Sequence, residues 1–305
     1  MFKSFNRHFL SYFDIIFSPP FEKKIKYKPI FIIGPPRSGS TLLMQILTQA
    51  YELGFLSNIH CKYFGSPSIS EKIFRYSSKK YISKNYTSEY GEILESGSPS
   101  ECGEYWYRFF PRLSFENKVF KINEKKMIRF RRSIHFFTKS LNKPLIFKNL
   151  YNSLRIKEIL TYIPEAVFIV INREEIQNAY SILSARLKNN GNYSDWWSVP
   201  PPGIDDILNS DPAIQVVEQI RKINKLINND LSEYNNKLVH YIKYEDLCSD
   251  VYNELRKVNI FFKNNGIDIK NNDSIPKRFT ISKNKLKDEE FATRIIRYSS
   301  NKNEE

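Results

Sequence analysis

Short, continuous runs of apolar residues alternate along the chain with stretches in which apolar residues recur at helical spacing. The runs occupy residues 30–33, 144–147, 166–171 and 237–242. Runs of this length are typical of strands that are buried on both faces of a parallel sheet. Helical spacing follows at residues 40–51 and 154–162, and again after residue 173. The alternation predicts an α/β fold, with a central parallel sheet flanked by helices in a single domain.

The remaining segments are less regular. Residues 61–135 are rich in aromatic and charged side chains and are expected to form helices and loops over the edge of the sheet. Residues 191–212 contain Trp196-Trp197 and three consecutive prolines, which predicts a long loop of the kind that often serves as a lid. The expected organisation is an apolar and basic segment at 1–28, the main domain at 29–285 and a charged, frayed tail at 286–305.

Composition narrows the class of protein. The 305 residues are 41% hydrophobic and 26% charged, which is ordinary for a soluble globular chain. Three scattered cysteines do not indicate a disulfide framework or a zinc site, so a reducing compartment is the default. The net charge of +14 fits an anionic partner, although a lysine-rich surface explains much of it equally well. No nucleic-acid-binding signature accompanies the charge, and nucleic acid is not an expected partner.

The turn after the first apolar run has the spacing of a phosphate-binding loop. Gly34 and Gly39 are separated by four residues, and Thr41 stands where such loops place a hydroxyl. The predicted strand before the turn and helix after it supply the context that the motif needs, because backbone N–H groups at a helix start bind anions. The usual lysine is replaced by Ser40, while a cation, Arg37, appears earlier in the loop.

The magnesium side of a nucleoside triphosphatase is missing as well. A strand that holds magnesium would end in aspartate, whereas the run at 166–171 ends in Asn172-Arg173. The pattern therefore indicates an anionic nucleotide that is held by arginine and hydroxyl groups with no obligatory metal. A chance loop is the alternative for this motif taken alone. An arginine at a second strand end argues against that alternative.

These motifs resemble those of the sulfotransferases that use 3′-phosphoadenosine 5′-phosphosulfate (PAPS), in particular the bacterial and tyrosylprotein branch whose loop reads P-R-S-G-[ST]-T-L. The resemblance extends from Pro29 to Asp250 and implies a fold with a P-loop-type sheet. The family's 3′-phosphate clamp is a strand-end arginine followed eight positions later by serine, which Arg173 and Ser181 match. The loop that binds the 5′-phosphosulfate corresponds here to Arg37, Ser38, Gly39, Ser40 and Thr41.

Two further positions match the family less closely. The tyrosylprotein branch has an arginine four residues after the clamp serine, where this chain has Ala185, and Arg186 follows one position later. One residue turns a helix by about 100°, so Arg186 is only a weak candidate. The stretch YIKYEDL resembles a late strand whose tyrosine approaches the nucleotide, which assigns Tyr244 to that role. A structural tyrosine at a strand end explains Tyr244 nearly as well.

The resemblance also indicates which groups act on the transferred sulfuryl group. Lys148, at the end of the run PLIFK, matches a lysine of this branch and is expected, with Arg37, to stabilise the transition state. In the segment SGSPSECGEYW, Glu101 is the first choice and Glu104 the second for the base that takes the acceptor proton. His60 is the other candidate base. Acids in a first helical turn are also favoured by the helix dipole, so a structural role for both glutamates stays open.

The predicted activity is in-line transfer of a sulfuryl group to an acceptor hydroxyl, with PAPS as co-substrate. A glycan, a lipid-linked saccharide and a small metabolite are the expected acceptors. Either the acceptor cleft or the core would hold the aromatic side chains Tyr105, Trp106, Tyr107, Phe109, Phe110, Trp196 and Trp197. The alternative functions are a kinase or NTPase with a degenerate loop, and a non-catalytic binder of anionic polymers.

The N-terminus carries an apolar stretch at residues 9–17, interrupted by Asp14. The stretch is too short to span a bilayer and lacks a signal-peptide pattern. Residues 9–28 are predicted either to pack on the domain as a helix or to make peripheral contact with a membrane. The expected location is therefore the cytoplasm, either free or associated with the inner face of the membrane.

Overall fold

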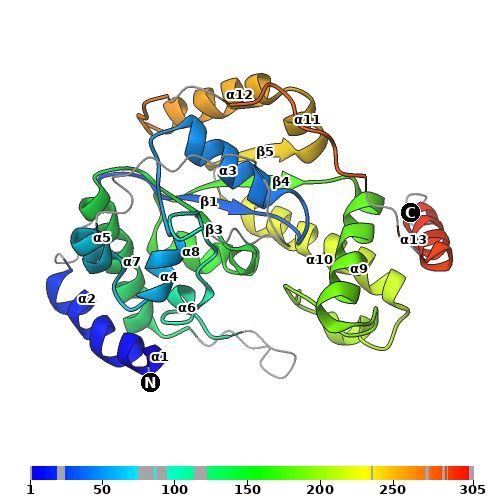
Figure 1. The fold of residues 1–305 in the computed structure, drawn as a ribbon, viewed down its shortest axis with the longest axis horizontal. Coiled ribbons are helices and arrows are strands. Elements are labelled where there is room, and N and C mark those ends of the chain that lie inside the picture. The colour runs from blue at the N-terminus through cyan, green and yellow to red at the C-terminus, as the bar shows by residue number, and fades with distance from the viewer. Residues whose placement is uncertain are drawn as a thin grey trace.

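Five parallel strands form one sheet in the order β2-β3-β1-β4-β5 (Figure 1). The computed structural model describes residues 2–18, 25–74, 86, 95–112, 122–234, 236–271, 275–283, 286 and 288–301. The strands are β1 (Ile30–Ile33), β2 (Gly54–Phe55), β3 (Leu145–Lys148), β4 (Val167–Asn172) and β5 (Val239–Lys243). Each neighbouring pair is parallel, so the strands all end at the same edge of the sheet. The predicted α/β fold is confirmed.

Each of the four apolar runs corresponds to a strand, and the first and last residues of each strand lie within two residues of those of the run. The sequence does not predict β2, because its two residues are too few to show a pattern. Gly54 and Phe55 nevertheless extend the sheet by pairing with Leu145 and Ile146 of β3.

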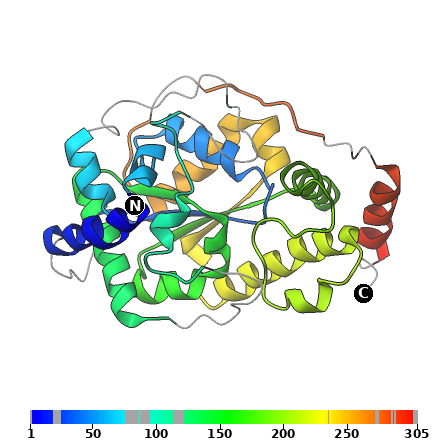
Figure 2. The ribbon, with the colours of Figure 1, turned by 60° about the horizontal axis from the view of Figure 1, so that its bottom comes forward.

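Helices cover both faces of the sheet (Figures 1 and 2). One face packs against α3 (Ser40–Ala50), α11 (Tyr244–Ser249) and α12 (Val251–Asn264). The other face packs against α7 (Glu124–Leu141), α8 (Ile156–Tyr162) and α10 (Pro212–Ser232). Alternate residues of β1 serve the two layers, with Ile30 and Ile32 on the first face and Phe31 and Ile33 on the second. Burial on both faces explains why the strands read as continuous apolar runs.

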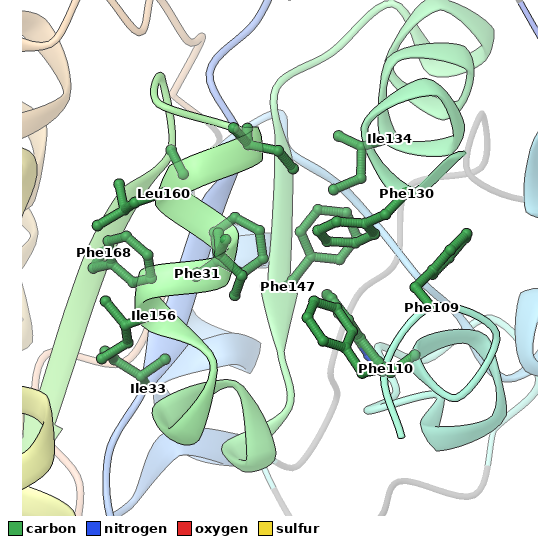
Figure 3. Close-up of a cluster of buried hydrophobic side chains, with 14 of the residues drawn as sticks. Phe31, Ile33, Phe109, Phe110, Phe130, Ile134, Phe147, Ile156, Leu160 and Phe168 are labelled. Carbon is green, nitrogen blue, oxygen red and sulfur yellow. The ribbon is translucent and has the colours of Figure 1, made fainter. Parts of the chain in front are cut away.

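Phe31 is the centre of the core on the α7 side (Figure 3). Its ring lies 5.4 Å from that of Phe147 on β3, 5.6 Å from Phe168 on β4 and 6.2 Å from Trp106. These rings come from three neighbouring strands and from the short helix α6 (Gly103–Trp106). The aromatic packing therefore fixes the position of α6 against the strand that leads into the glycine loop.

The N-terminal segment is helical and packs on the domain through polar groups. It comprises α1 (Phe2–Phe5), η1 (Asn6–Leu10) and α2 (Ser11–Phe17). Asp14, which interrupts the apolar stretch, is buried and accepts hydrogen bonds from Arg108 at 2.8 Å and Ser66 at 3.0 Å. The predicted interfacial segment 9–28 continues into residues 19–24, which lie outside the described residues.

The segment expected over the sheet edge contains the end of α4 (Asn58–Lys62), all of α5 (Pro67–Phe74) and α6, and most of α7. Residues 75–85, 87–94 and 113–121 of that segment lie outside the described part of the chain. The predicted long loop at 191–212 is present and holds one short turn, η4 (Ile204–Ile207), after α9 (Glu175–Asn190). Two further short turns are η3 (Leu150–Leu154) and η5 (Asn236–Leu238).

The expected frayed tail is instead largely a helix, α13 (Glu289–Asn301), which packs on α9 and α10. Ile295 is fully buried there, with Phe291 and Tyr298 beside it. These three positions recur at helical spacing, a signal that the surrounding charged residues hide in the sequence. None of the helices in the described ranges is both long enough and apolar enough to cross a membrane.

Candidate active site

The turn between β1 and α3 is a tight loop that requires both of its glycines. Gly34 has a φ of 153°, and a Cβ there would lie 2.3 Å from the carbonyl oxygen of Ile171. Gly39 has a φ of 96°, and a Cβ there would lie 2.3 Å from the ring of Tyr244. The loop therefore lies directly against the end of β4 and against the residue that follows β5.

Arg37 and Arg173 meet at this loop. The Nε of Arg37 donates a hydrogen bond to the Oγ of Ser181 on α9 at 3.0 Å. Arg173, just after β4, donates to the carbonyl oxygen of Arg37 at 3.3 Å. Asn178, also on α9, donates to the carbonyl of Pro36 at 2.7 Å. The strand-end arginine and the helix serine of the predicted clamp are thus brought together on the arginine of the loop.

Tyr244 completes this group from the far side of β4. Its ring packs on Gly39, and the guanidinium of Arg173 lies 4.6 Å from its centre. Its hydroxyl oxygen accepts a hydrogen bond from the backbone N–H of Ser282 at 3.2 Å, and Arg173 donates to the Ser282 carbonyl. Burial raises the pKa of Tyr244, so the phenol is protonated at neutral pH.

Lys148 and Glu101 form an ion pair at the end of β3. The side chain of Lys148 is 5% exposed, whereas that of Glu101 is 38% exposed and opens to the surface. The Glu101 backbone carbonyl accepts hydrogen bonds from the Trp106 indole at 2.8 Å and from Asn149 at 3.1 Å. The candidate base is therefore held by its main chain, with its carboxylate beside a nearly buried ammonium group.

One cleft of about 800 Å³ joins these two groups of residues. Its lining includes Arg37, Gly39, Ser40 and Thr41 of the loop, Arg173 and Tyr244 on one side, and Glu101 and Lys148 on the other. Residues that were not predicted as site residues also line it, among them Asn58, Asn149, Tyr151 and Ser282. The structure thus brings most of the predicted site residues to the carboxyl ends of three adjacent strands, β3, β1 and β4.

Ser38 and Ser181 lie beneath the surface of the cleft and do not line it. Ser181 supports Arg37 from below, as its hydrogen bond shows. Ser38 is fully buried, and its hydroxyl oxygen has no hydrogen-bond partner among the described residues. Buried hydroxyl groups usually form hydrogen bonds, so the Ser38 hydroxyl keeps a hydrogen-bonding capacity that the loop itself does not use.

The two second-choice bases are engaged elsewhere. His60 is fully buried, accepts a hydrogen bond from the Ser57 backbone N–H at 3.0 Å and faces a Glu71 carboxylate oxygen at 3.1 Å. It caps α4 and does not line the cleft. Glu104 lies at the rim of the cleft, where its carboxylate accepts hydrogen bonds from Lys3 at 3.2 Å, Arg7 at 3.1 Å and Arg112 at 2.7 Å. Of the three candidates, only Glu101 has its carboxylate at Lys148.

Arg186 lies away from the cleft. It is fully buried and donates hydrogen bonds to Gln215 at 2.7 Å and to the Tyr193 carbonyl at 3.3 Å. Its guanidinium also lies 4.8 Å from the ring centre of Trp196. Burial lowers the pKa of Arg186 to about 10. Arg186 therefore anchors the loop at 191–203 through Tyr193 and Trp196. It lies one position after the family arginine and so points in another direction from the helix.

The aromatic residues divide between core and cleft. Tyr107 and Trp197 line the cleft. Trp196 lies under Arg186. The other four are buried in the core on the α7 side: Tyr105, Trp106, Phe109 and Phe110.

Sequence reasoning missed two residues that hold the site together. Asn149 follows Lys148 directly, and the same strand-end logic that selected the lysine would have selected it. Ser282 acts through its backbone, so no side-chain pattern points to it. Within the described parts of the chain, no three His, Cys, Asp or Glu residues gather in a way that would hold a metal ion.

A parallel sheet whose first strand leads through a glycine loop into a helix defines a P-loop-type α/β protein. Within that class, residues 29–264 match the sulfotransferase family, and the chain belongs to this family. It is therefore a transferase, and the kinase, NTPase and non-catalytic binder that the sequence left open are not supported.

A solved structure with a TM-score above 0.5 agrees with this assignment at the level of the fold, and a second is given for comparison. Sulfotransferase STF9 from Mycobacterium avium is 11% identical over 90% of this chain and 68% of its own, with a TM-score of 0.54. Sulfotransferase STF1 from Mycobacterium tuberculosis H37Rv is 13% identical over 79% of this chain and 68% of its own, with a TM-score of 0.49. No curated protein matches the chain in sequence.

The environment of Glu104 predicts a pH-dependent contribution to stability. Burial raises its pKa, but the hydrogen bond and charge of Lys3 and the charges of Arg112 and Arg7 outweigh burial and hold the pKa below its usual value. A lowered pKa in the folded state stabilises the protein above the unfolded value of about 4.3, and this contribution is lost as the pH falls through the folded-state pKa. Glu104→Gln should therefore lower the free energy of unfolding at pH 7 by about 1 kcal/mol.

Urea denaturation at pH 7 and near pH 3 measures this difference. The gap between the wild type and Glu104→Gln should close at the lower pH. Glu95→Gln is the control, because Glu95 is exposed and forms no ion pair with the described residues. An equal gap at both pH values would show that the carboxylate charge is not the cause.

Proposed function

We propose that this sulfotransferase transfers a sulfuryl group from PAPS to an acceptor hydroxyl by in-line displacement. The observation that carries the proposal is the pairing of two features in one cleft. The first feature is the glycine loop at the end of β1, which carries Arg37 and is contacted by Arg173 and Tyr244. The second is the Lys148–Glu101 pair at the end of β3. The first group suits a nucleotide with two anionic ends, and the second suits proton removal next to a developing negative charge.

The residues of the cleft fit a phosphoadenosine nucleotide in size and in chemistry. A volume of about 800 Å³ lies in the range of sites for nucleotide-sized ligands. Ser40 and Thr41 begin α3 and line the cleft, and the backbone N–H groups at a helix start favour an anion. We assign the 5′-phosphosulfate to this loop with Arg37, and the 3′-phosphate to Arg173, with Ser181 holding Arg37 in place. Tyr244 closes the loop from above Gly39.

The reaction breaks the sulfur–oxygen bond to the leaving 5′-phosphate and forms a sulfur–oxygen bond to the acceptor. The acceptor hydroxyl loses its proton, and we assign Glu101 as the group that receives it. Lys148 lies next to that carboxylate, so it can stabilise negative charge on the sulfuryl oxygens and on the leaving phosphate. Positioning and electrostatics supply the rate, as in phosphoryl transfer.

Tyr107 and Trp197 line the cleft, and we assign the acceptor to the part of the cleft beside them. Aromatic rings with polar edges suit the faces of sugar rings. We therefore propose a glycan, a lipid-linked saccharide or a small metabolite as the acceptor.

The same N-terminal helices that pack near the cleft support a peripheral membrane contact. Phe9, Tyr12 and Ile16 are 51%, 60% and 53% exposed, and their spacing places them on one side of the segment. Lys3 and Arg7 of this segment pair with Glu104, but the net charge of the whole chain, +14, matches the charge of anionic lipid headgroups. We propose that this segment rests on an anionic membrane surface, which agrees with a cytoplasmic protein at the inner face of the membrane.

Nucleotide binding provides the first test. In the absence of magnesium, PAP, the desulfated nucleotide, should raise the melting temperature of the wild type, because a ligand of the native state stabilises it. Arg37→Ala and Arg173→Ala each remove a charge-assisted contact and should weaken PAP binding about 10- to 100-fold. Arg256→Ala, an exposed arginine on α12, is the matched control and should bind PAP normally. A wild type that millimolar PAP does not stabilise would contradict PAPS dependence.

Separation of binding from transfer provides the second test. Glu101→Gln should keep PAP-induced stabilisation but lose about 100-fold in sulfate transfer, because the amide cannot accept the proton. Transfer is measured with labelled PAPS and a pool of glycans and lipids. Transfer at the wild-type rate would exclude Glu101 as the base, and Glu104→Gln in the same assay tests the second choice.

Membrane contact is tested with vesicles that contain phosphatidylglycerol. The double variant Phe9→Ala/Tyr12→Ala removes two exposed rings and should lower co-sedimentation about tenfold or more. Ile260→Ala, which removes a side chain of similar exposure on α12, should have no effect. Equal co-sedimentation of the double variant and the wild type would remove the N-terminal helices as the contact.

A further inference from the structure

A second cavity, of about 790 Å³, lies between the N-terminal helices and α7. In both ribbon views these helices run beside α7 at the edge of the molecule (Figures 1 and 2). Among the described residues, seven lysine and arginine side chains line the cavity, together with two carboxylates. The imbalance creates a concentrated positive potential inside a concave surface, which is the electrostatic condition for binding an anion.

Both carboxylates that line the cavity form ion pairs with side chains of the protein. Asp14 is bound by Arg108, and Glu104 is bound by Lys3, Arg7 and Arg112. These pairs hold the N-terminal helices against α6 and shape the wall of the cavity.

Two cations remain available on α7. Lys126 and Arg129 line the cavity, are exposed, and form no ion pair with any described residue. They are three residues apart on one helix and so lie on the same face. Arg132, one further turn along, donates to the backbone carbonyls of Ile15 at 3.1 Å and Ser18 at 3.3 Å. The α7 wall thus offers a row of basic groups, of which two are free to bind a ligand.

The cavity adjoins the active cleft. Glu104 and Tyr107 line both. Tyr107 lies at the junction, with the guanidinium of Arg112 at 4.5 Å from its ring centre. A molecule whose hydroxyl lies near Glu101 would pass Tyr107 on its way to the basic cavity.

We propose that the cavity is a second anion site, which binds a phosphate or sulfate ester carried by the acceptor. The proposal rests on the proposed function for the identity of the acceptor, but the site itself is defined by Lys126 and Arg129. Guanidinium and ammonium groups bind tetrahedral oxyanions through charge-assisted hydrogen bonds. The volume exceeds the needs of a single ion and suits an ester attached to a larger group. The acceptor class is then an anionic ester with a free hydroxyl, not a neutral sugar.

Calorimetric titration of the full chain with inorganic phosphate tests the site. The protein is first saturated with PAP, so that the glycine loop cannot take the phosphate, and ionic strength is held constant. The wild type should bind phosphate saturably, and Lys126→Ala/Arg129→Ala should bind about tenfold more weakly. Alanine keeps the exposed helix folded. Lys125→Ala is the matched control, because Lys125 is exposed on the same helix outside the cavity.

The outcomes separate this proposal from the previous one. Failure of PAP to bind contradicts PAPS dependence, yet the effect of the double variant on phosphate binding can still be measured. If PAP binds but phosphate binding is absent, or is equal in the double variant and the wild type, the anion site is overturned.

Two esters distinguish the source of the anion and test the ester itself. Glucose 1-phosphate represents a soluble ester, and phosphatidylglycerol vesicles represent a lipid headgroup. The ester that competes with inorganic phosphate in the wild type, and no longer binds to the Lys126→Ala/Arg129→Ala variant, identifies the source. If neither competes, the cavity does not bind esters and the proposal is overturned. Labelled products of the transfer assay should also carry at least one anionic group besides the new sulfate, and a singly charged product would overturn the acceptor class.

Discussion

The site depends on the contacts of the Arg173 guanidinium. This group donates hydrogen bonds to the carbonyls of Arg37 and Ser282 and lies over the ring of Tyr244. Three segments that are far apart in the sequence are thereby joined to the end of β4. Since β4 pairs with β1 in parallel, the same cation stands next to the glycine loop. A single charged group thus contacts the loop and places positive charge where the proposed nucleotide would bind.

The opposite wall follows from the other neighbour of β1. β3 also runs parallel to β1 and ends in Lys148, which pairs with Glu101. The aromatic core beneath, centred on Phe31, holds α6 and therefore the Glu101 backbone, whose carbonyl the Trp106 indole binds. Because β1 lies between β3 and β4, the loop is flanked by Lys148 on one side and Arg173 on the other. Core packing and site geometry are thus consequences of the same strand order.

Local patterns in the sequence were sufficient to predict the fold and the residues that follow the strand ends. A buried parallel strand reads as an apolar run, and Lys148 and Arg173 stand directly after such runs, so their common edge could be inferred. Roles that depend on distant partners could not be inferred. The residues around His60 do not predict its contact with Glu71. Those around Glu104 do not predict its ion pairs with Lys3 and Arg7. The two-residue strand β2 and the helix α13 were missed because one is too short and the other too charged to show its pattern.

The central claim is that the loop at the end of β1 and the arginine at the end of β4 bind the two anionic ends of one nucleotide. Calorimetric titration with PAP and with AMP, in the absence of magnesium, tests it directly, because the two ligands differ only in the 3′-phosphate. PAP should bind at least tenfold more tightly than AMP, as expected for a charge-assisted contact to one further phosphate. Equal affinities, or tighter binding of ATP that requires magnesium, would contradict the account.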